Sequence, residues 1–401
     1  METTSTNRRN GLKVASLFSG IGGVELGLQA SGFSTEILCE IDEAARTVLK
    51  SRFPNVPIHS DVRTLSKLPK VDLLAAGFPC QDLSQAGRKV GITGNNSGLV
   101  QHVFRLIAKP KSARPKWVLL ENVTYMLRLD RGQAMRHIIS AFEQLGYRWA
   151  YRVVDIRSFG LPQRRQRVVF LASNSYDPRE VLFADDQGIP EVEPRPALTD
   201  ERSCYGFYWT EGSRGVGWAL EATPPIKGGS TIGIPSPPAV WRPRHDFVGT
   251  IHIDDAERLQ GFEAGWTMPV LESGHTRPVS IRWRMVGNAV CVPMAEWVGQ
   301  RLMSPQPFLL KAEAFTTGAL PIAAWGERGK IYAVNASKWP LRRNRPKLSA
   351  FLQHDLKPLS ERATLGFLSR AKTCTNVVYS ERFLGSLATH AASMKSATIK
   401  Q

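Results

Sequence analysis

Short apolar runs alternate with stretches of helical periodicity over residues 12–172. The runs that we expect to form strands are Val14–Phe18, Thr35–Glu40, Val71–Ala76, Trp117–Glu121, Tyr151–Asp155 and Arg167–Ala172. The stretches between them that predict helices are Val24–Ser31, Glu43–Arg52, Leu99–Ala108 and Gly132–Leu145. This alternation predicts an α/β fold with a doubly wound, mostly parallel sheet. In such a sheet, ligands bind at the carboxyl ends of the strands.

The alternation stops after residue 173. Residues 174–250 hold ten of the 26 prolines and three of the ten tryptophans, which is typical of an irregular, loop-rich module. Helical periodicity returns at Asp254–Gln260 and at Pro293–Leu302. The chain therefore has at least two differently built regions.

The chain is strongly basic, with 52 Lys and Arg against 35 Asp and Glu and a net charge of +17 over 401 residues. Residues 301–401 hold 16 of the basic and 5 of the acidic residues. A basic excess of this size favours a polyanionic partner, most simply nucleic acid. The segments Leu348–Leu352 and Leu359–Ser369 are amphipathic, so we expect residues 305–401 to form a basic, helical C-terminal extension.

Membrane and secretory features are not evident in the sequence. No apolar run approaches the roughly 20 residues that span a bilayer, and the N-terminus lacks the apolar segment of a secretory signal. The five cysteines are widely spaced, and no Cys/His cluster indicates zinc. We therefore expect a reduced, cytoplasmic protein without a structural metal.

A glycine-rich segment, Phe18–Gly23 (FSGIGG), lies between the first predicted strand and the first predicted helix. Glycine lets the backbone approach a ligand closely, and a helix N-terminus favours an anionic group. The next strand ends at Glu40, where doubly wound folds often place an acid on ribose hydroxyls, and Asp61 follows another short run. The three sites suggest an adenosine-containing cofactor. An ordinary tight turn is the alternative interpretation of the glycines.

Two further residues carry candidate chemistry. Cys80 follows Pro79 just beyond the strand Val71–Ala76, where this fold would place a nucleophile, although a buried, unreactive cysteine is the alternative. Glu121 ends another predicted strand, and a cap or a salt bridge is its alternative role.

Two arginines, Arg165 and Arg167, open the last predicted strand in the segment QRRQR. Strand alternation places both side chains on one face of the sheet. A solvated basic strand end is the alternative.

Taken in order, these motifs resemble those of the cytosine-C5 DNA methyltransferases, in particular the bacterial and phage members. FSGIGG is similar to the family's S-adenosylmethionine loop, and Pro79-Cys80-Gln81 to its catalytic Pro-Cys-Gln. The segments ENV at 121–123, QRRQR at 163–167, RLQGF at 258–262 and GNAV at 287–290 follow in the family's order. The resemblance covers roughly residues 12–302.

The resemblance implies an S-adenosylmethionine-dependent methyltransferase fold with a discontinuous catalytic domain. Residues 12–173 would form the catalytic and cofactor-binding domain, and residues 174–280 a smaller, irregular target-recognition domain. Residues 281–304 would return to complete the catalytic domain before the extension at 305–401.

The resemblance also implies a mechanism and a set of site residues. Cys80 would add to C6 of a cytosine flipped out of the duplex, so that C5 attacks the methyl group of S-adenosylmethionine. Glu121 would contact N3 and the exocyclic amine, and Arg165 and Arg167 would contact O2 and a nearby phosphate. The residues implied for the cofactor are Phe18, Gly20, Ile21, Gly23, Glu40, Ile41, Asp61, Val62, Pro79, Leu99, Asn288 and Ala289. No metal is implied.

The implied activity is that of a DNA (cytosine-5-)-methyltransferase that acts as a monomer on a short site in double-stranded DNA. A cognate restriction endonuclease acting separately is a compatible partner. A tRNA cytosine-C5 methyltransferase of the same fold is one alternative, but that branch typically has Phe-Thr after Pro-Cys, where this chain has Gln81 and Asp82. A non-catalytic DNA-binding relative would not need Cys80 and Glu121. A nicotinamide-dependent oxidoreductase would share the glycine-rich turn but not Pro-Cys-Gln.

Overall fold

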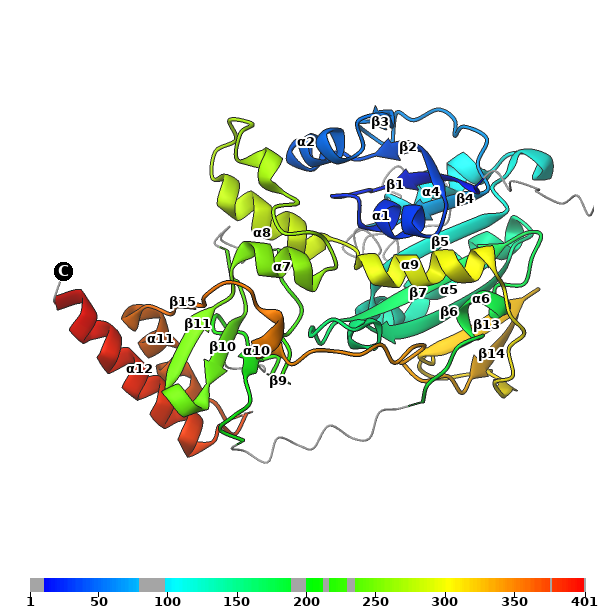
Figure 1. The fold of residues 1–401 in the computed structure, drawn as a ribbon. Helices are drawn as coiled ribbons and strands as arrows, with labels where there is room; N and C mark the ends of the chain where they lie inside the picture. The colour runs from blue at the N-terminus through cyan, green and yellow to red at the C-terminus, as the bar shows by residue number, and fades with distance from the viewer. Residues whose placement is uncertain are drawn as a thin grey trace, which may run out of the picture.

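A computed structural model describes residues 11–78, 98–188, 200–211, 216–228, 235–375 and 377–399. Two sheets organise this part of the chain (Figure 1). The larger sheet consists of β1 (Lys13–Leu17), β2 (Ser34–Cys39), β3 (Ile58–His59), β4 (Leu73–Ala76), β5 (Trp117–Val123), β6 (Arg148–Asp155), β7 (Gln166–Ser173), β12 (Ala312–Ala314), β13 (Ala323–Glu327) and β14 (Lys330–Val334). Their spatial order is β12-β14-β13-β6-β7-β5-β4-β1-β2-β3.

The larger sheet is mixed, which corrects the expectation of a mostly parallel sheet. Strands β3, β2, β1, β4 and β5 pair in parallel, whereas β7 is antiparallel to both β5 and β6. Only a short helical turn, Ile156–Phe159, and a loop separate β6 from β7. A parallel pair needs a crossover of a dozen or more residues, so this connection makes the two strands antiparallel.

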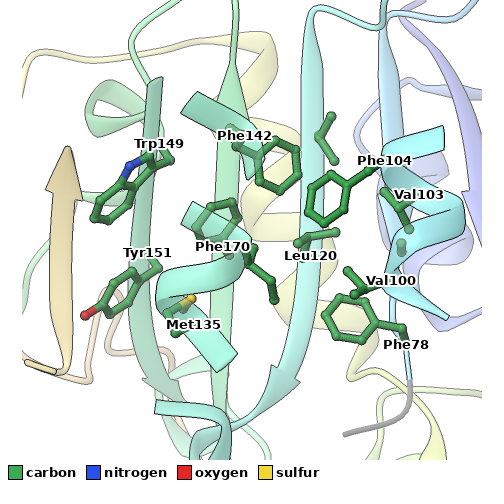
Figure 2. Close-up of a cluster of buried hydrophobic side chains, with 14 of the residues drawn as sticks. Phe78, Val100, Val103, Phe104, Leu120, Met135, Phe142, Trp149, Tyr151 and Phe170 are labelled. Carbon is green, nitrogen blue, oxygen red and sulfur yellow. The ribbon is translucent and has the colours of Figure 1, made fainter. Parts of the chain in front are cut away.

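Helices cover both faces of the larger sheet. One face is covered by α4 (Val100–Ile107) and α5 (Gln133–Gln144), and the other by α1 (Gly23–Ala30), α6 (Arg179–Leu182) and α9 (Val292–Met303). On the first face Phe142 lies between Phe104 and Phe170, at ring-centroid distances of 5.1 and 5.3 Å (Figure 2). The predicted helix at Pro293–Leu302 is therefore present, and it returns to the sheet that begins the chain.

The smaller sheet arises mostly from the proline- and tryptophan-rich region, with one further strand from the C-terminal region. It contains β8 (Tyr205–Phe207), β9 (Ala219–Leu220), β10 (Ala239–Arg242), β11 (Phe247–Thr250) and β15 (Lys357–Pro358), all antiparallel. The C-terminal helices α11 (Glu361–Thr373) and α12 (Glu381–Ile399) pack against it (Figure 1). Buried aromatic rings form this core, among them Tyr205, Phe207, Trp241, Phe367 and Phe383.

The last hundred residues differ from the helical extension that the sequence predicts. The helices α10 (Leu348–Phe351) and α11 occupy the two predicted amphipathic segments. However, β13 pairs with β6 inside the larger sheet, and β15 pairs with β11 in the smaller one. The strand segment Ala323–Glu327 has little β-branched character, so its pairing depends on the sheet that receives it rather than on its own pattern.

Two helices, α7 (Ile253–Leu259) and α8 (Pro278–Asn288), lie between the two sheets (Figure 1). The helix α2 (Glu43–Arg52) packs beside β3. Among the described residues, no helix is both long and apolar enough to cross a membrane.

Candidate active site

A cavity of about 830 Å³ opens at one edge of the larger sheet. Its walls include the residues that directly follow β1, β2 and β4, the end of β5, and the start of the antiparallel β7. The opposite wall comes from the region of the smaller sheet and from α8. The cavity therefore lies where a parallel sheet positions ligands, at the carboxyl ends of its strands.

The structure brings most of the predicted site residues together around this cavity. Those that line it are Phe18, Gly20, Ile21, Glu40, Ile41, Asp61, Val62, Leu99, Glu121, Arg165, Arg167 and Asn288. Pro79 and Cys80 lie outside the described residues. Gly23 and Ala289 do not line the cavity: a Cβ at Gly23 would lie 2.2 Å from the carbonyl oxygen of Val290, so this glycine permits close packing, and Ala289 is buried.

The glycine-rich loop leaves open space toward the cavity. Gly20 has φ +56°, and a Cβ built there would meet no atom within 4 Å. Gly22 has φ +89°, and a Cβ there would lie 2.4 Å from the ring of Phe53. The loop is fixed to the neighbouring strand because the Ser19 amide donates to the Cys39 carbonyl at 3.1 Å. The glycines thus serve both the turn and the approach of a ligand.

Glu40 supports this loop from the end of β2. Its Oε2 accepts from the Gly20 amide at 2.7 Å, and its Oε1 accepts from the Asp42 amide at 2.8 Å. Burial raises the pKa of the Glu40 carboxyl above its ordinary value. Beside it, the apolar side chain of Ile41 is 60% exposed, which suits contact with a flat, apolar ligand surface.

Asp61 is already engaged by a neighbour. The Arg63 guanidinium donates to both oxygens of Asp61, at 3.0 and 2.7 Å, and this hydrogen bonding lowers the pKa of the carboxyl. A ligand that contacts Asp61 must share it with Arg63.

Glu25, in the first turn of α1, is fully buried behind the glycine-rich loop. Burial raises the pKa of its carboxyl from an ordinary value of 4.5 to about 7, partly offset by the hydroxyls of Ser16 and Ser19. A raised folded-state pKa favours the folded state at low pH. This contribution is lost as pH rises from about 4.5 to about 7.

Glu25→Gln should therefore remove a pH-dependent loss of stability. Relative to the unsubstituted protein, the free energy of unfolding of the variant should increase by about 2–3 kcal/mol between pH 5 and pH 8. Urea unfolding at several pH values measures this difference. The exposed Glu263→Gln is the control, and parallel stability curves for Glu25→Gln and the unsubstituted protein would contradict the prediction.

Glu121 and Arg167 form an ion pair at the end of the cavity opposite to the glycine-rich loop and Glu40. The Arg167 Nε lies 2.8 Å from the Glu121 Oε1, and each side chain is only about a tenth exposed. Burial lowers the pKa of the Arg167 guanidinium, while the charge of Glu121 opposes this shift. The adjacent Asn122 donates from Nδ2 to the carbonyl of Phe78 at 3.1 Å. Strand β5 thus fixes the backbone two residues before Cys80.

Arg165 is buried and joins three segments of the chain. Its Nη1 donates to the carbonyls of Ile226 at 3.3 Å and Gly287 at 3.1 Å, and its Nη2 to that of Ala289 at 2.9 Å. Burial lowers the pKa of this guanidinium to about 9. The buried Nε has no hydrogen-bond partner within the described residues. As strand alternation predicts, Arg165 and Arg167 line the same cavity.

Several lining residues were not predicted. The ammonium of Lys227 pairs with Glu211 and lies 3.8 Å from the ring centre of Tyr208, and desolvation lowers its pKa. At the cavity rim, the Arg284 Nη2 contacts the Asp42 Oδ2 at 2.5 Å. A basic residue in the run PPIKGG was the available signal for Lys227, but nothing in the sequence connected that run to the cavity.

Comparison with known proteins identifies related sequences along nearly the whole chain. The model of the C-5 cytosine-specific DNA methylase family matches residues 12–197. The Type II methyltransferase M2.BsuMI of Bacillus subtilis (strain 168) is 55% identical over 378 residues, which cover 94% of this chain and 97% of that protein. The Type II methyltransferase M.NgoBI of Neisseria gonorrhoeae is 33% identical over 202 residues, 47% of this chain and 62% of that protein.

Solved structures share the fold at low sequence identity. The Dnmt2 methyltransferase of S. pombe superposes with a TM-score of 0.52 at 16% identity, covering 73% of this chain and 98% of that one. The match with M2.BsuMI, by contrast, is long enough to include most of the last hundred residues of this chain. The strands and helices of the C-terminal region thus fall mostly within the length shared with that relative.

Proposed function

Because this chain belongs to the C-5 cytosine-specific DNA methylase family and methylates cytosine in DNA, we propose that the 830 Å³ cavity holds both S-adenosylmethionine and the target base. The observation that carries this proposal is that both sets of residues line one cavity. The glycine-rich loop and Glu40 lie at one end, and the Glu121–Arg167 pair and the unpartnered Nε of Arg165 lie at the other.

The residues at the first end suit the cofactor. The open space at Gly20 leaves room for the amino acid part, and the lone pairs of Glu40 suit ribose hydroxyls. Ile41 and Leu99 offer apolar surface for the adenine, and Asp61 suits its amino edge. When bound, S-adenosylmethionine supplies an electrophilic methyl group.

The residues at the second end suit a cytosine. Glu121 would donate to N3 and accept from the exocyclic amine, and the Arg165 Nε would donate to O2. The thiolate of Cys80 would form a bond to C6 as the C5–C6 double bond opens, which makes C5 nucleophilic toward the methyl group. Loss of the C5 proton and of the thiolate would then restore the ring. Asn122 would position the nucleophile through the Phe78 carbonyl.

The two sheets would have different functions, catalysis and recognition of the target sequence. The larger sheet with its helices would be the catalytic domain. The smaller sheet, from whose side Tyr208 and Lys227 reach the cavity, would recognise the target sequence. The base must leave the duplex to reach Glu121, so base flipping is part of the proposal. We also propose that the enzyme acts as a monomer and that a restriction endonuclease of the same site acts separately.

The direct test is methyl transfer from labelled S-adenosylmethionine to duplex DNA and, in parallel, to tRNA. Label should enter DNA, and bisulfite sequencing should find 5-methylcytosine at one short recurring site. Labelling of tRNA alone would overturn the proposed substrate.

Glu40→Ala should weaken binding of S-adenosylmethionine by about tenfold or more. The substitution removes the acceptor of two backbone amides and of the proposed ribose hydroxyls, and hydrogen bonds to charged groups contribute about 1.5–3 kcal/mol each. Calorimetric titration with S-adenosylmethionine measures the change. Glu43→Ala is the matched control, because Glu43 is exposed in the same region and does not line the cavity. Equal affinities for both variants would exclude this role of Glu40.

A further inference from the structure

Two histidines and an aspartate from distant parts of the sequence meet outside the cavity. His252 and Asp254 lie at the start of α7, and His354 lies in the loop after α10, roughly a hundred residues later. One potential ligand atom from each residue lies within 4.8 Å of the others. The two imidazole rings stack with centroids 4.3 Å apart and an interplanar angle of 20°.

Asp254 is oriented so that one oxygen faces both histidines. Its Oδ1 accepts from the Arg282 Nη2 at 2.8 Å. Its Oδ2 lies 3.7 Å from the His252 Nδ1 and 3.9 Å from the His354 Nε2. The His252 Nδ1 also accepts from the Asp254 amide at 3.3 Å, so an ion bound at this nitrogen would replace that hydrogen bond. Arg282 is buried in α8, so the direction of the carboxylate is fixed from the protein interior.

His354 is oriented from its other side. Its buried Nδ1 lies 3.3 Å from the Oδ2 of Asp255 but makes no hydrogen bond within the described residues, and Asp255, a fully buried carboxylate, accepts from the backbone amides of Gln353 and His354 at 3.0 and 3.1 Å. A histidine that binds a metal through one nitrogen typically directs the other to a carboxylate, which fixes the ring orientation and raises its basicity.

We propose that His252, Asp254 and His354 bind a divalent transition metal ion, with Zn²⁺ as the best match. Two imidazoles and one carboxylate suit Zn²⁺, with a water molecule in the fourth position, and they do not suit Mg²⁺ or Ca²⁺, which prefer oxygen ligands. Ligand atoms in a tetrahedral zinc site lie about 3.3 Å apart, so side-chain rotations that shorten the observed separations, which are at most 4.8 Å, by about 1.5 Å or less would close the site. The three side chains are between about a fifth and a half exposed, which leaves the ion a path of entry.

Such an ion would link the loop after α10 to the start of α7. Already, the Arg258 Nη1 donates to the Phe351 carbonyl, and Asp255 accepts from the amides of Gln353 and His354. A metal bond to His354 would add a strong link from this loop to α7 and, through Arg282, to α8. The site would thus be structural, and its ligands do not line the cavity proposed for catalysis.

The test is titration of the chelator-treated, full-length protein with Zn²⁺ by calorimetry, and with Co²⁺ by absorption spectroscopy. The unsubstituted protein should bind one ion per chain, and the melting temperature should rise with Zn²⁺, because a ligand of the folded state stabilises it. Bound Co²⁺ should give visible bands of a four- or five-coordinate site without the near-ultraviolet charge-transfer band of a thiolate ligand. Mg²⁺ should leave the melting temperature unchanged.

Two conservative variants locate the ion. His252→Asn keeps a side chain that can cap α7, and His354→Gln keeps the size and polarity of the side chain. Each should weaken Zn²⁺ binding by about tenfold or more and leave the melting temperature without metal nearly unchanged. His245→Ala, at an exposed histidine outside the cluster, is the matched control and should bind like the unsubstituted protein. Undiminished binding in both variants, a thiolate band, or no binding to the unsubstituted protein would overturn the proposal.

Discussion

Cys80→Ser should abolish methyl transfer and leave DNA binding intact. A serine hydroxyl is far less acidic than a thiol and cannot supply the thiolate that attacks C6 at neutral pH. The substitution is nearly isosteric, so the Asn122 contact with the Phe78 carbonyl should be retained. The measurement pairs a turnover assay with a DNA-binding titration on the same duplex.

A duplex that carries 5-fluorocytosine at the target tests directly whether Cys80 forms a covalent bond to the base. Fluorine at C5 cannot leave as a proton does, so the covalent adduct should accumulate with the unsubstituted enzyme and be absent with Cys80→Ser. Cys374→Ser is the control, because Cys374 lies in the C-terminal region and outside the cavity. Turnover that persists in Cys80→Ser would rule out covalent catalysis by this residue.

Glu121→Gln should lower turnover by roughly 10²-fold or more, the scale of general acid–base groups. The glutamine amide retains the shape of the carboxyl but can neither transfer a proton to N3 nor balance the charge of Arg167, whose Nε lies 2.8 Å away in the unsubstituted protein. The affinity for S-adenosylmethionine should barely change, because Glu40 and not Glu121 faces the proposed cofactor end. Single-turnover rates and calorimetric binding distinguish these effects.

The exposed Glu263→Gln should match the unsubstituted enzyme in both measurements. A melting temperature for Glu121→Gln close to that of the unsubstituted protein would show that the loss is chemical and not a consequence of unfolding. If this variant instead loses S-adenosylmethionine and retains its rate at saturation, Glu121 belongs to the cofactor site.

The sequence predicted the elements whose identity is decided locally. The six expected strands of the larger sheet are present within three residues at each end, and β1, β2 and β4 deliver Phe18, Glu40 and Gly77 to the cavity. These strands carry continuous apolar runs because both faces of the sheet are covered. The glycine-rich segment after the first strand and the acid at Glu40 could therefore be predicted from their positions, whereas the family resemblance supplied the roles of the individual residues.

Features that depend on distant contacts were not predicted. The position of β13 beside β6 and the three carbonyls that hold Arg165 depend on segments many residues away. The His252–His354 stack likewise has no local pattern, and this is why the spacing of cysteines and histidines indicated no metal site. Periodicity reports which face of an element is buried, but not which other element buries it.

The pairing of β13 with β6 determines when the protein can finish folding during synthesis. Strand β6 presents unpaired amides and carbonyls along one edge until residues 323–327 have emerged from the ribosome, and the smaller sheet lacks its helical cover until α11 and α12 follow. Exposed strand edges and apolar faces promote association between chains. Chains that terminate early should therefore aggregate, and the cell should contain functional enzyme only when translation reaches the last helix.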